Sequence, residues 1–446
     1  MFLKKIVLAL VALIVFGMSW RAGDVVGINI AGLGLVAVFG LLAFVFAIAF
    51  LLFGRHEPGR APVPMDAAVL LFGVFVVINF ASIGWAEHPN IAVSSAISYF
   101  QLLTFVWLLA FLRSEKTAFP LLLRAYLLGL SVIAIGSIIE VATLSDGLEE
   151  TRGRNFGIDR NTVAFKTVLG IPVAVYLFRR SSVTRHRWLY LAYLPLGVAA
   201  VVLTGSRTGL LALGWVLAAL TWLLIGMEKR GTVRFSATRT LVAVGALAAV
   251  VVSLIPYLAE RLPRHIERFS TLADPMASNV GGRGDMWAAA IEVYLNNFLL
   301  GIGSGGGGTA ILSYFEGDVY VFTFLDQGVS LHNVFLAIAT GTGTVGLLLF
   351  LAVILALILR TVSFPREERL LFLSMIGASL VMALTLGLEQ SRDFFFALFL
   401  PVALSLAHYP AGARARSRRR TRFRPKVGPD SRSAPAPQPP HSVARS

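Results

Sequence analysis

The stretch LHNVFLAIATGTGTVGLLLFLAVILALIL, residues 331–359, decides the fold class of this chain. It carries no Asp, Glu, Lys or Arg, and it is longer than the roughly 20 apolar residues that a helix needs to cross a bilayer. A helix satisfies its own backbone polar groups inside hydrocarbon, so the stretch predicts a membrane-spanning helix.

Composition extends this prediction to the whole chain. Of its 446 residues, 57% are hydrophobic and only 14% are charged, and the mean hydropathy is +0.77. A soluble domain carries nearer a quarter charged residues. We therefore expect an all-α polytopic membrane protein with a bundle of about twelve spans within residues 1–409. The expected spans are residues 4–20, 26–53, 66–85, 91–112, 118–142, 161–178, 188–204, 208–226, 240–258, 331–359, 370–388 and 394–409.

Lys and Arg are unevenly divided between the two sides of such a bundle. If the N-terminus is cytoplasmic, the short outer segments hold only six, whereas the inner segments collect most of the rest. The six are Arg21, Arg152, Arg154, Arg160, Arg207 and Arg392. The positive-inside rule therefore favours both termini in the cytoplasm. A long loop between the ninth and tenth spans, residues 259–331, then lies outside and is expected to carry short helices.

The formal charge of +15 does not imply a nucleic-acid partner. Many of the basic residues lie in the tail, residues 410–446, which is rich in Arg, Pro and Ser. Such a composition cannot build a core, so we expect a disordered cytoplasmic tail held by anionic membrane lipid. The chain has no Cys, which excludes disulfides, thiolate metal sites and Cys nucleophiles.

Three outer positions are candidates for chemistry. Arg207 lies in a tight TGSRTG turn, residues 204–209, where glycines let backbone N–H groups approach an anion. Arg283 opens an amphipathic helix that we expect to end near Gly301, and free N–H groups at a helix start favour negative charge. His332 lies where the tenth span begins, and a helix N-terminus favours a neutral imidazole able to accept a proton. The simpler alternatives are arginines that only reach headgroups or water, and a structural histidine.

Two further outer segments are informative. The GIGSGGGG run, residues 301–308, lacks the Lys-Ser/Thr ending of a phosphate loop, so we expect a hinge or a close approach of two backbones. Lys166 lies in the first turns of a span, beyond Arg160 and Asn161, and such a lysine is costly enough to require a partner. No cluster with metal-ligand spacing occurs, and neither a metal nor another cofactor is expected.

Taken together, these segments resemble the family of O-antigen ligases and Wzy polymerases of the bacterial envelope. The matching pieces are SRTG at residues 206–209, RGDMW at 283–287, LGIG at 300–303, and HN at 332–333 leading into GTVGL at 343–347. Their order and their common side of the membrane carry the resemblance, which covers about residues 155–348.

The resemblance implies a GT-C-like glycosyltransferase that uses no nucleotide sugar. Such enzymes move a glycan from an undecaprenyl pyrophosphate carrier to a hydroxyl at the periplasmic face, with inversion at the anomeric carbon. By position, Arg207 and Arg283 match the arginines that hold the pyrophosphate, and His332 matches the histidine that assists the acceptor or orients the phosphate. Arg160, Asn161, Lys166 and Asn333 are further candidates for substrate binding.

The acceptor separates the two activities of that family. A ligase transfers the glycan to a sugar of the lipid A core, and a polymerase transfers it to the next carrier-linked repeat. We favour the ligase because the motif set is compact and the outer loop modest. A flippase for lipid-linked glycan is a third reading, although we find no convincing internal repeat and few charges deep within spans. A scaffold that acts through its basic tail is a fourth.

Overall fold

The computed structural model of the chain describes residues 2–20, 29–30, 33–53, 66–143, 154–155, 158–228, 283–312 and 330–405. The expected ninth span, residues 240–258, and the expected tail, residues 410–446, lie outside the described residues. Arg21 and Arg152 also lie outside the described residues, as does most of the long loop expected at residues 259–331.

The described chain is almost entirely helical. The helices are α1 (Phe2–Met18), α3 (Leu35–Phe53), α4 (Ala67–Ala81), α5 (Pro89–Leu112), α6 (Ala118–Thr143), α7 (Arg160–Arg180), α8 (Thr184–Leu203), α9 (Arg207–Glu228), α12 (Arg283–Asn296), α13 (Gly307–Ala310), α15 (Val334–Val362), α16 (Arg366–Ala383) and α17 (Arg392–Phe399), with short 3-10 helices η1 (Ser82–Trp85) and η6 (Leu400–Ala403). Strand β1 (Asn29–Ile30) pairs antiparallel with β2 (Leu33–Gly34), and β3 (Arg154–Asn155) pairs antiparallel with β4 (Ile158–Asp159).

Side-chain caps fix where several of these helices begin. Asp66 accepts the N–H of Ala68 at 3.2 Å before α4, and Asn333 accepts that of Leu336 at 3.1 Å before α15. Such caps satisfy N–H groups that have no partner within the helix. At most positions, the helix starts predicted from hydropathy agree with those of the structure within a few residues.

The described part of the chain confirms a polytopic α-helical membrane protein. Within it, seven helices are long and apolar enough to span a bilayer: residues 35–53, 67–85, 89–112, 118–140, 160–180, 184–203 and 334–362. The apolar part of α9, Arg207–Trp222, is shorter, and α1 has 17 residues. The predicted count of twelve stays a prediction.

Two predicted spans differ from the structure at their ends. Helix α3 begins at Leu35 rather than near residue 26, because a short hairpin precedes it in a glycine-rich stretch. The run predicted at residues 394–409 contains α17, which ends at Phe399 and passes into the 3-10 turn that holds Pro401. Proline lacks the N–H that would continue the α-helix, which explains the early end.

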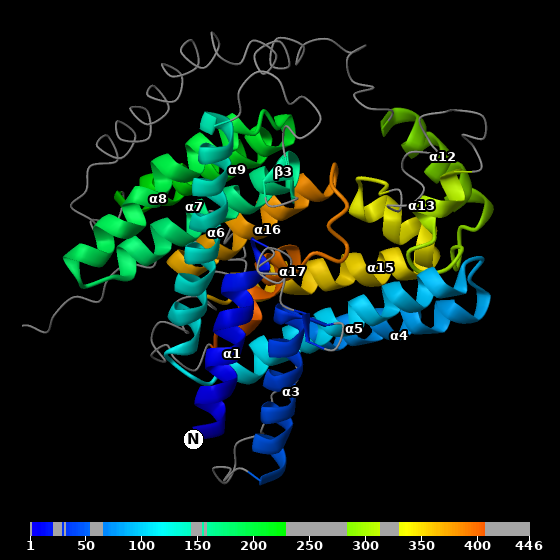
Figure 1. The fold of residues 1–446 in the computed structure, drawn as a ribbon, viewed down its shortest axis with the longest axis horizontal. Helices are drawn as coiled ribbons and strands as arrows, with labels where there is room; N and C mark the ends of the chain where they lie inside the picture. The colour runs from blue at the N-terminus through cyan, green and yellow to red at the C-terminus, as the bar shows by residue number, and fades with distance from the viewer. Residues whose placement is uncertain are drawn as a thin grey trace, which may run out of the picture.

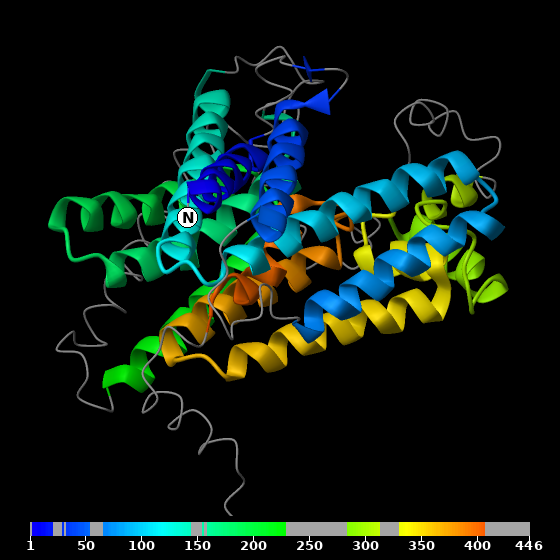
Figure 2. The ribbon, with the colours of Figure 1, turned by 90° about the horizontal axis from the view of Figure 1, so that it is seen from below.

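The helices form two groups that meet at α17 (Figure 1). Helices α7, α8, α9 and α16 pack together in one group, with α6 against α7 and α8. Helices α4, α5 and α15 run side by side in the other, as the second view also shows (Figure 2). Helices α12 and α13 lie over the N-terminal end of α15.

Ion pairs gather the basic segments at one end of the bundle. Lys4 pairs with Glu115 at 3.1 Å, and Asp66 pairs with both Arg113 and Arg360. Further along the chain, Arg179 and Arg180 pair with Glu367 and Glu368 at the start of α16. These charges lie at alternate connections between successive helices. When successive helices cross a membrane, alternate connections lie on the same side of it. The candidate site lies at the opposite end.

Helix α15 is broken where it passes the glycine-rich run. Gly343 has φ 66° and ψ −165°, which is not helical. The groups freed by the break pair with the segment before α13: Ile302 N donates to Thr340 O at 3.0 Å, Gly303 N to Gly341 O at 2.9 Å, and Thr344 N to Phe298 O at 2.7 Å. A Cβ on Gly301 or Gly343 would meet that facing backbone. The close approach predicted for the glycine run is confirmed, and it satisfies backbone groups that a broken span leaves free.

Candidate active site

Arg283 is the first residue of α12, and contacts on both sides of the helix fix α12 on α15. Trp287 donates its indole N–H to Leu331 O at 2.9 Å, and the Tyr294 and Thr344 hydroxyls are 2.8 Å apart. The buried face of α12 consists of Ala289, Ala290 and Val293. As expected for an amphipathic helix on the membrane surface, the apolar residues Ile291, Leu295, Phe298 and Leu299 point outward and are each about half exposed or more. That exposure suits a helix lying against lipid.

His332 is held in a strained backbone conformation. Its φ is 49°, and no other non-glycine residue among those described has a positive φ. Its backbone N–H donates to Ser330 Oγ at 3.2 Å, and the next residue, Asn333, caps α15. Left-handed backbone in a residue other than glycine costs free energy and is concentrated at functional sites.

The surroundings of the His332 imidazole, which is partly buried, favour its neutral form. Burial lowers the pKa of His332 below its ordinary value of 6.5, and the Arg283 charge lowers it further, while Asp159 opposes them. Nδ1 is buried and has no hydrogen-bond partner among the described residues. The predicted neutral ring agrees with this direction, although burial and Arg283 are the causes rather than the helix N-terminus alone. A neutral ring with a free nitrogen is able to accept a proton or a hydrogen bond.

Arg283 and His332 both lie close enough to Asp159, at the start of α7, to feel its charge. Burial lowers the pKa of Arg283, and Asp159, which acts on His332 as well, raises it. Asp159 accepts the N–H groups of Asn161 and Thr162 at 2.9 and 3.1 Å and so caps α7. The structure therefore brings together Arg283, His332 and the segment that contains Arg160 and Asn161. Sequence reasoning gave Asp159 no role, although an Asp before a helix is a recognisable cap.

Arg207 opens α9 beside the same end of α7. Gly205 adopts φ 63°, and Ser206 Oγ accepts the N–H of Gly209 at 3.1 Å, which fixes the turn. A Cβ on Gly209 would meet the Cβ of Ala164, one turn into α7, so the two helices touch there. The structure thus places the turn that carries Arg207 beside the first turns of α7, the helix that Asp159 caps.

Lys166 has the partner that its position required. Its Nζ lies 3.1 Å from Asp393 Oδ2 and donates to Ser19 O at 2.8 Å, and Ser19 Oγ donates to Asp393 Oδ1 at 2.8 Å. Lys166 and Asp393 are both almost fully buried. The pair joins the starts of α7 and α17 to the end of α1, which stabilises the helices that carry the site.

The three candidate residues lie within a segment that matches a known family model. Residues 191–351 match the family model of the O-antigen ligases. The matched segment runs from α8 into α15 and contains Arg207, Arg283, His332 and Asn333. The match is consistent with the resemblance to O-antigen ligases and Wzy polymerases found in the motifs, and it supports an enzyme that processes lipid-linked glycans in the envelope. A comparison with curated proteins gave no match.

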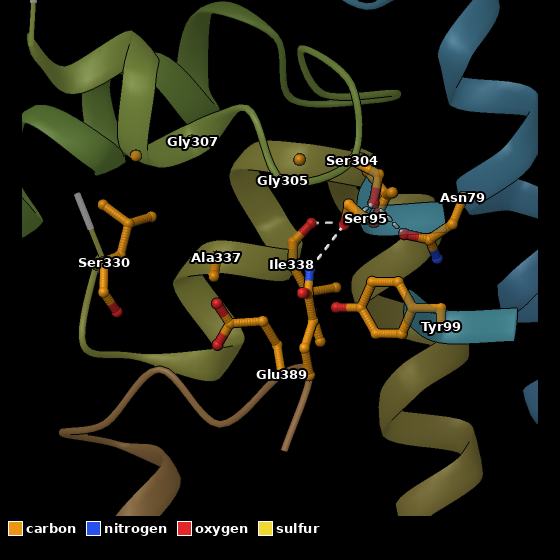
Figure 3. Close-up of a pocket in the computed structure, with 15 residues that line it drawn as sticks. Asn79, Ser95, Tyr99, Ser304, Gly305, Gly307, Ser330, Ala337, Ile338 and Glu389 are labelled. Atoms are coloured by element: carbon orange, nitrogen blue, oxygen red, sulfur yellow. Dashed lines mark hydrogen bonds between the residues drawn. The ribbon is translucent and has the colours of Figure 1, made fainter. Parts of the chain in front are cut away.

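A polar cavity lies next to the O-antigen ligase motifs (Figure 3). It is enclosed by α4, α5, the glycine-rich run, the first turns of α15 and the loop between α16 and α17. Ser330 and Leu331, which directly precede His332, form part of its wall. Sequence reasoning missed this cavity. Asn79 within an apolar span and Glu389 in a short outer loop were the available signals, but only the fold brings them together.

Proposed function

We propose that this protein is an O-antigen ligase-type glycosyltransferase of the bacterial inner membrane. It transfers a glycan from undecaprenyl pyrophosphate to a sugar hydroxyl of the lipid A core at the periplasmic face, with inversion and without a metal. The observation that carries the proposal is that Arg283 and the strained His332 act on each other's charge near Asp159, and that both residues lie in the segment that matches the O-antigen ligase family model.

The residues suit this chemistry. The acceptor oxygen attacks the anomeric carbon, the bond from that carbon to the pyrophosphate oxygen breaks, and the electron pair leaves with the pyrophosphate. Negative charge therefore grows on the leaving group, and positioned guanidinium groups stabilise the transition state. Arginine is well suited because its planar fork binds two oxygens and stays charged. The neutral His332 either takes the acceptor proton or orients the phosphate.

The side of the membrane follows from the charge asymmetry. The end of the bundle that holds Lys4, Arg113, Arg179 and Arg360 is the basic one, and the candidate site lies at the other. Basic segments stay in the cytoplasm, so we place the site in the periplasm and the N-terminus inside. Nucleotide sugars are scarce there, which is why the energy has to arrive in the lipid-linked bond.

The flanking candidates take supporting roles in this proposal. Arg160 and Asn161 begin α7 beside Asp159 and can reach the pyrophosphate or the adjoining sugar. Asn333 is committed to capping α15 through its side chain. The ammonium of Lys166 is already bound by Asp393 and Ser19, so we assign it to positioning α7 rather than to gripping the donor.

A Wzy-type polymerase shares the donor site and differs in its acceptor. A flippase is less well supported by the structure. Broken helices in transporters commonly leave backbone groups for ions or substrate. In α15, backbone groups at the break are instead paired with residues 298–303.

Purified protein with a synthetic carrier-linked glycan tests the proposal. We expect transfer to lipid A core without nucleotide, and Arg283→Ala and Arg207→Ala should each reduce the rate by roughly tenfold to a hundredfold, because a hydrogen bond to a charged group contributes about 1.5–3 kcal/mol. Arg185→Ala, an exposed arginine at the basic end, is the matched control. Elongation on the carrier without transfer to the core would identify a polymerase, and unchanged rates in both site variants would refute the donor grip.

A further inference from the structure

The cavity beside His332 has one wall that is fully ordered by hydrogen bonds. Gln390 Nε2 donates to Ser95 Oγ at 3.0 Å, the hydroxyls of Ser95 and Ser304 are 2.8 Å apart, and Ser304 Oγ donates to Asn79 Oδ1 at 2.5 Å. Asn79 in turn donates to Phe75 O at 2.8 Å. These polar groups come from four separate parts of the chain and hold one another in place, so the wall is preformed.

The opposite wall presents a carboxylate with an unused oxygen. Glu389 Oε2 is buried and has no hydrogen-bond partner among the described residues. The carboxylate points toward Ser330 and Ala337, and Ser95 and Tyr99 lie on the other side of Glu389 (Figure 3). The turn that carries Glu389 is fixed, since Gln390 binds Ser95 and Ser391 caps α17. A buried acceptor left unpaired costs free energy, and a ligand that donates a hydrogen bond would recover it.

The size and charge of the cavity restrict what it binds. Its volume is about 50 Å³, which is room for roughly three to five water-sized groups. None of the described residues that line it is a Lys, Arg or His, and Glu389 is the ionisable carboxylate among them. An anion such as phosphate is therefore disfavoured. Several hydroxyl and amide groups around one acceptor instead fit a neutral group that carries hydroxyls.

The cavity and the candidate donor site adjoin each other. Ser330 lines the cavity and its hydroxyl also accepts the backbone N–H of His332. The Cα atoms of these two residues are at most about 7 Å apart, because each residue spans no more than about 3.6 Å. The segment from Ser330 to His332 has a different charge on each side. The Arg283 guanidinium favours an anion on the His332 side, and the Glu389 carboxylate disfavours an anion on the cavity side. The two substrates of a transfer reaction would be separated by charge in this way.

We propose that this cavity binds the hydroxyl-bearing edge of a neutral sugar, the terminal sugar of the acceptor, and that the Glu389 carboxyl group hydrogen-bonds one of its hydroxyls. Naming that sugar as the acceptor rests on the proposed function. The binding of a neutral sugar does not, since it follows from the cavity alone. Burial also raises the pKa of Glu389 to about 7. The group is therefore able to accept or to donate a hydrogen bond near neutral pH, as a neutral hydroxyl permits.

Ligand-observed NMR on the full-length protein in detergent measures binding without turnover. The probes are methyl hexopyranosides, with methyl glucopyranosiduronate as the anionic comparison. We expect saturation transfer to at least one neutral sugar and little to the uronate. Glu389→Ala should weaken sugar binding roughly tenfold or more, and Glu389→Gln should weaken it less. Tyr99→Phe leaves the loop that carries Glu389 intact and should also weaken sugar binding. Glu292→Gln, an exposed carboxylate on α12, is the matched control.

Two outcomes overturn the inference. Either the wild-type protein binds no neutral hexoside, or Glu389→Ala and Tyr99→Phe bind it as the wild type does, which would leave a cavity that holds only water. In the transfer assay, Glu389→Ala should raise the acceptor KM while the donor KM stays within about twofold of wild type. Sugar binding without any transfer by the wild type would refute the proposed function and leave the cavity assignment standing.

Discussion

The backbone strain at His332 allows its structural and chemical roles to be separated. At φ 49° a side chain with a Cβ is disfavoured by roughly 1–2 kcal/mol, and glycine is not. Glycine loses more conformational freedom on folding, which costs it roughly 0.5–1 kcal/mol relative to alanine. We therefore expect His332→Gly to be more stable than His332→Ala by about 0.5–1 kcal/mol, although both variants lack the imidazole.

The assay pairs thermal unfolding of the purified variants with the rate of glycan transfer. His332→Gly should unfold at a higher temperature than His332→Ala, while both lose transfer to a similar extent. The matched control is Glu292 on the exposed face of α12, where Glu292→Gly should be less stable than Glu292→Ala by about 1 kcal/mol. If alanine is the more stable substitution at both positions, the strain at His332 is not real. If His332→Gly transfers at the wild-type rate, the imidazole has no role in the reaction.

Three further predictions follow from individual contacts. Asp393→Leu should destabilise the protein by roughly 3–5 kcal/mol, because it leaves Lys166 charged and unpaired. Adding Lys166→Met should restore part of the lost unfolding temperature, and no restoration would contradict a buried pair. As pH rises from about 4.5 to 7, the unfolding temperature of the wild type should fall relative to that of Glu389→Gln. In this range the Glu389 carboxyl still holds a proton in the folded protein, whereas the unfolded chain has released it. Parallel curves of unfolding temperature against pH would argue against the raised pKa of Glu389. Gly343→Ala should lower both stability and transfer, since its Cβ would meet Leu299, whereas Gly73→Ala, with open space around it, should not; equal melting temperatures would show that the break in α15 tolerates a side chain.

Local patterns made most of the fold predictable. Runs without charge set the spans, and Asp66 and Asn333 mark helix starts by a mechanism that is visible in sequence. The need for a partner at Lys166 was predictable from the cost of a buried charge, and that prediction is confirmed. Its identity was not, because Asp393 is distant in sequence and only the packing of α7 against α17 and α1 brings it near.

The break in α15 was not predictable from hydropathy. Thr340–Thr344 reads as part of one apolar run, and the break is stable because residues 298–303 supply its hydrogen bonds. The amphipathic character of α12 was predictable: its larger apolar residues face outward and its small ones face the protein. For the candidate site, residue types and order indicated Arg207, Arg283 and His332. The cavity at Glu389 depends on contacts among five parts of the chain, which no single segment records.

The central claim is that Arg207 and Arg283 face one periplasmic pocket. The chain has no native Cys, so Arg207→Cys with Arg283→Cys introduces a single reactive pair. We predict that a short bismaleimide joins the two positions in spheroplasts and that a membrane-impermeant maleimide labels both from outside. The pair Arg185→Cys with Arg283→Cys, at opposite ends of the bundle, should not be joined. Labelling of positions 207 and 283 only after permeabilisation, or no cross-link between them, would contradict the account.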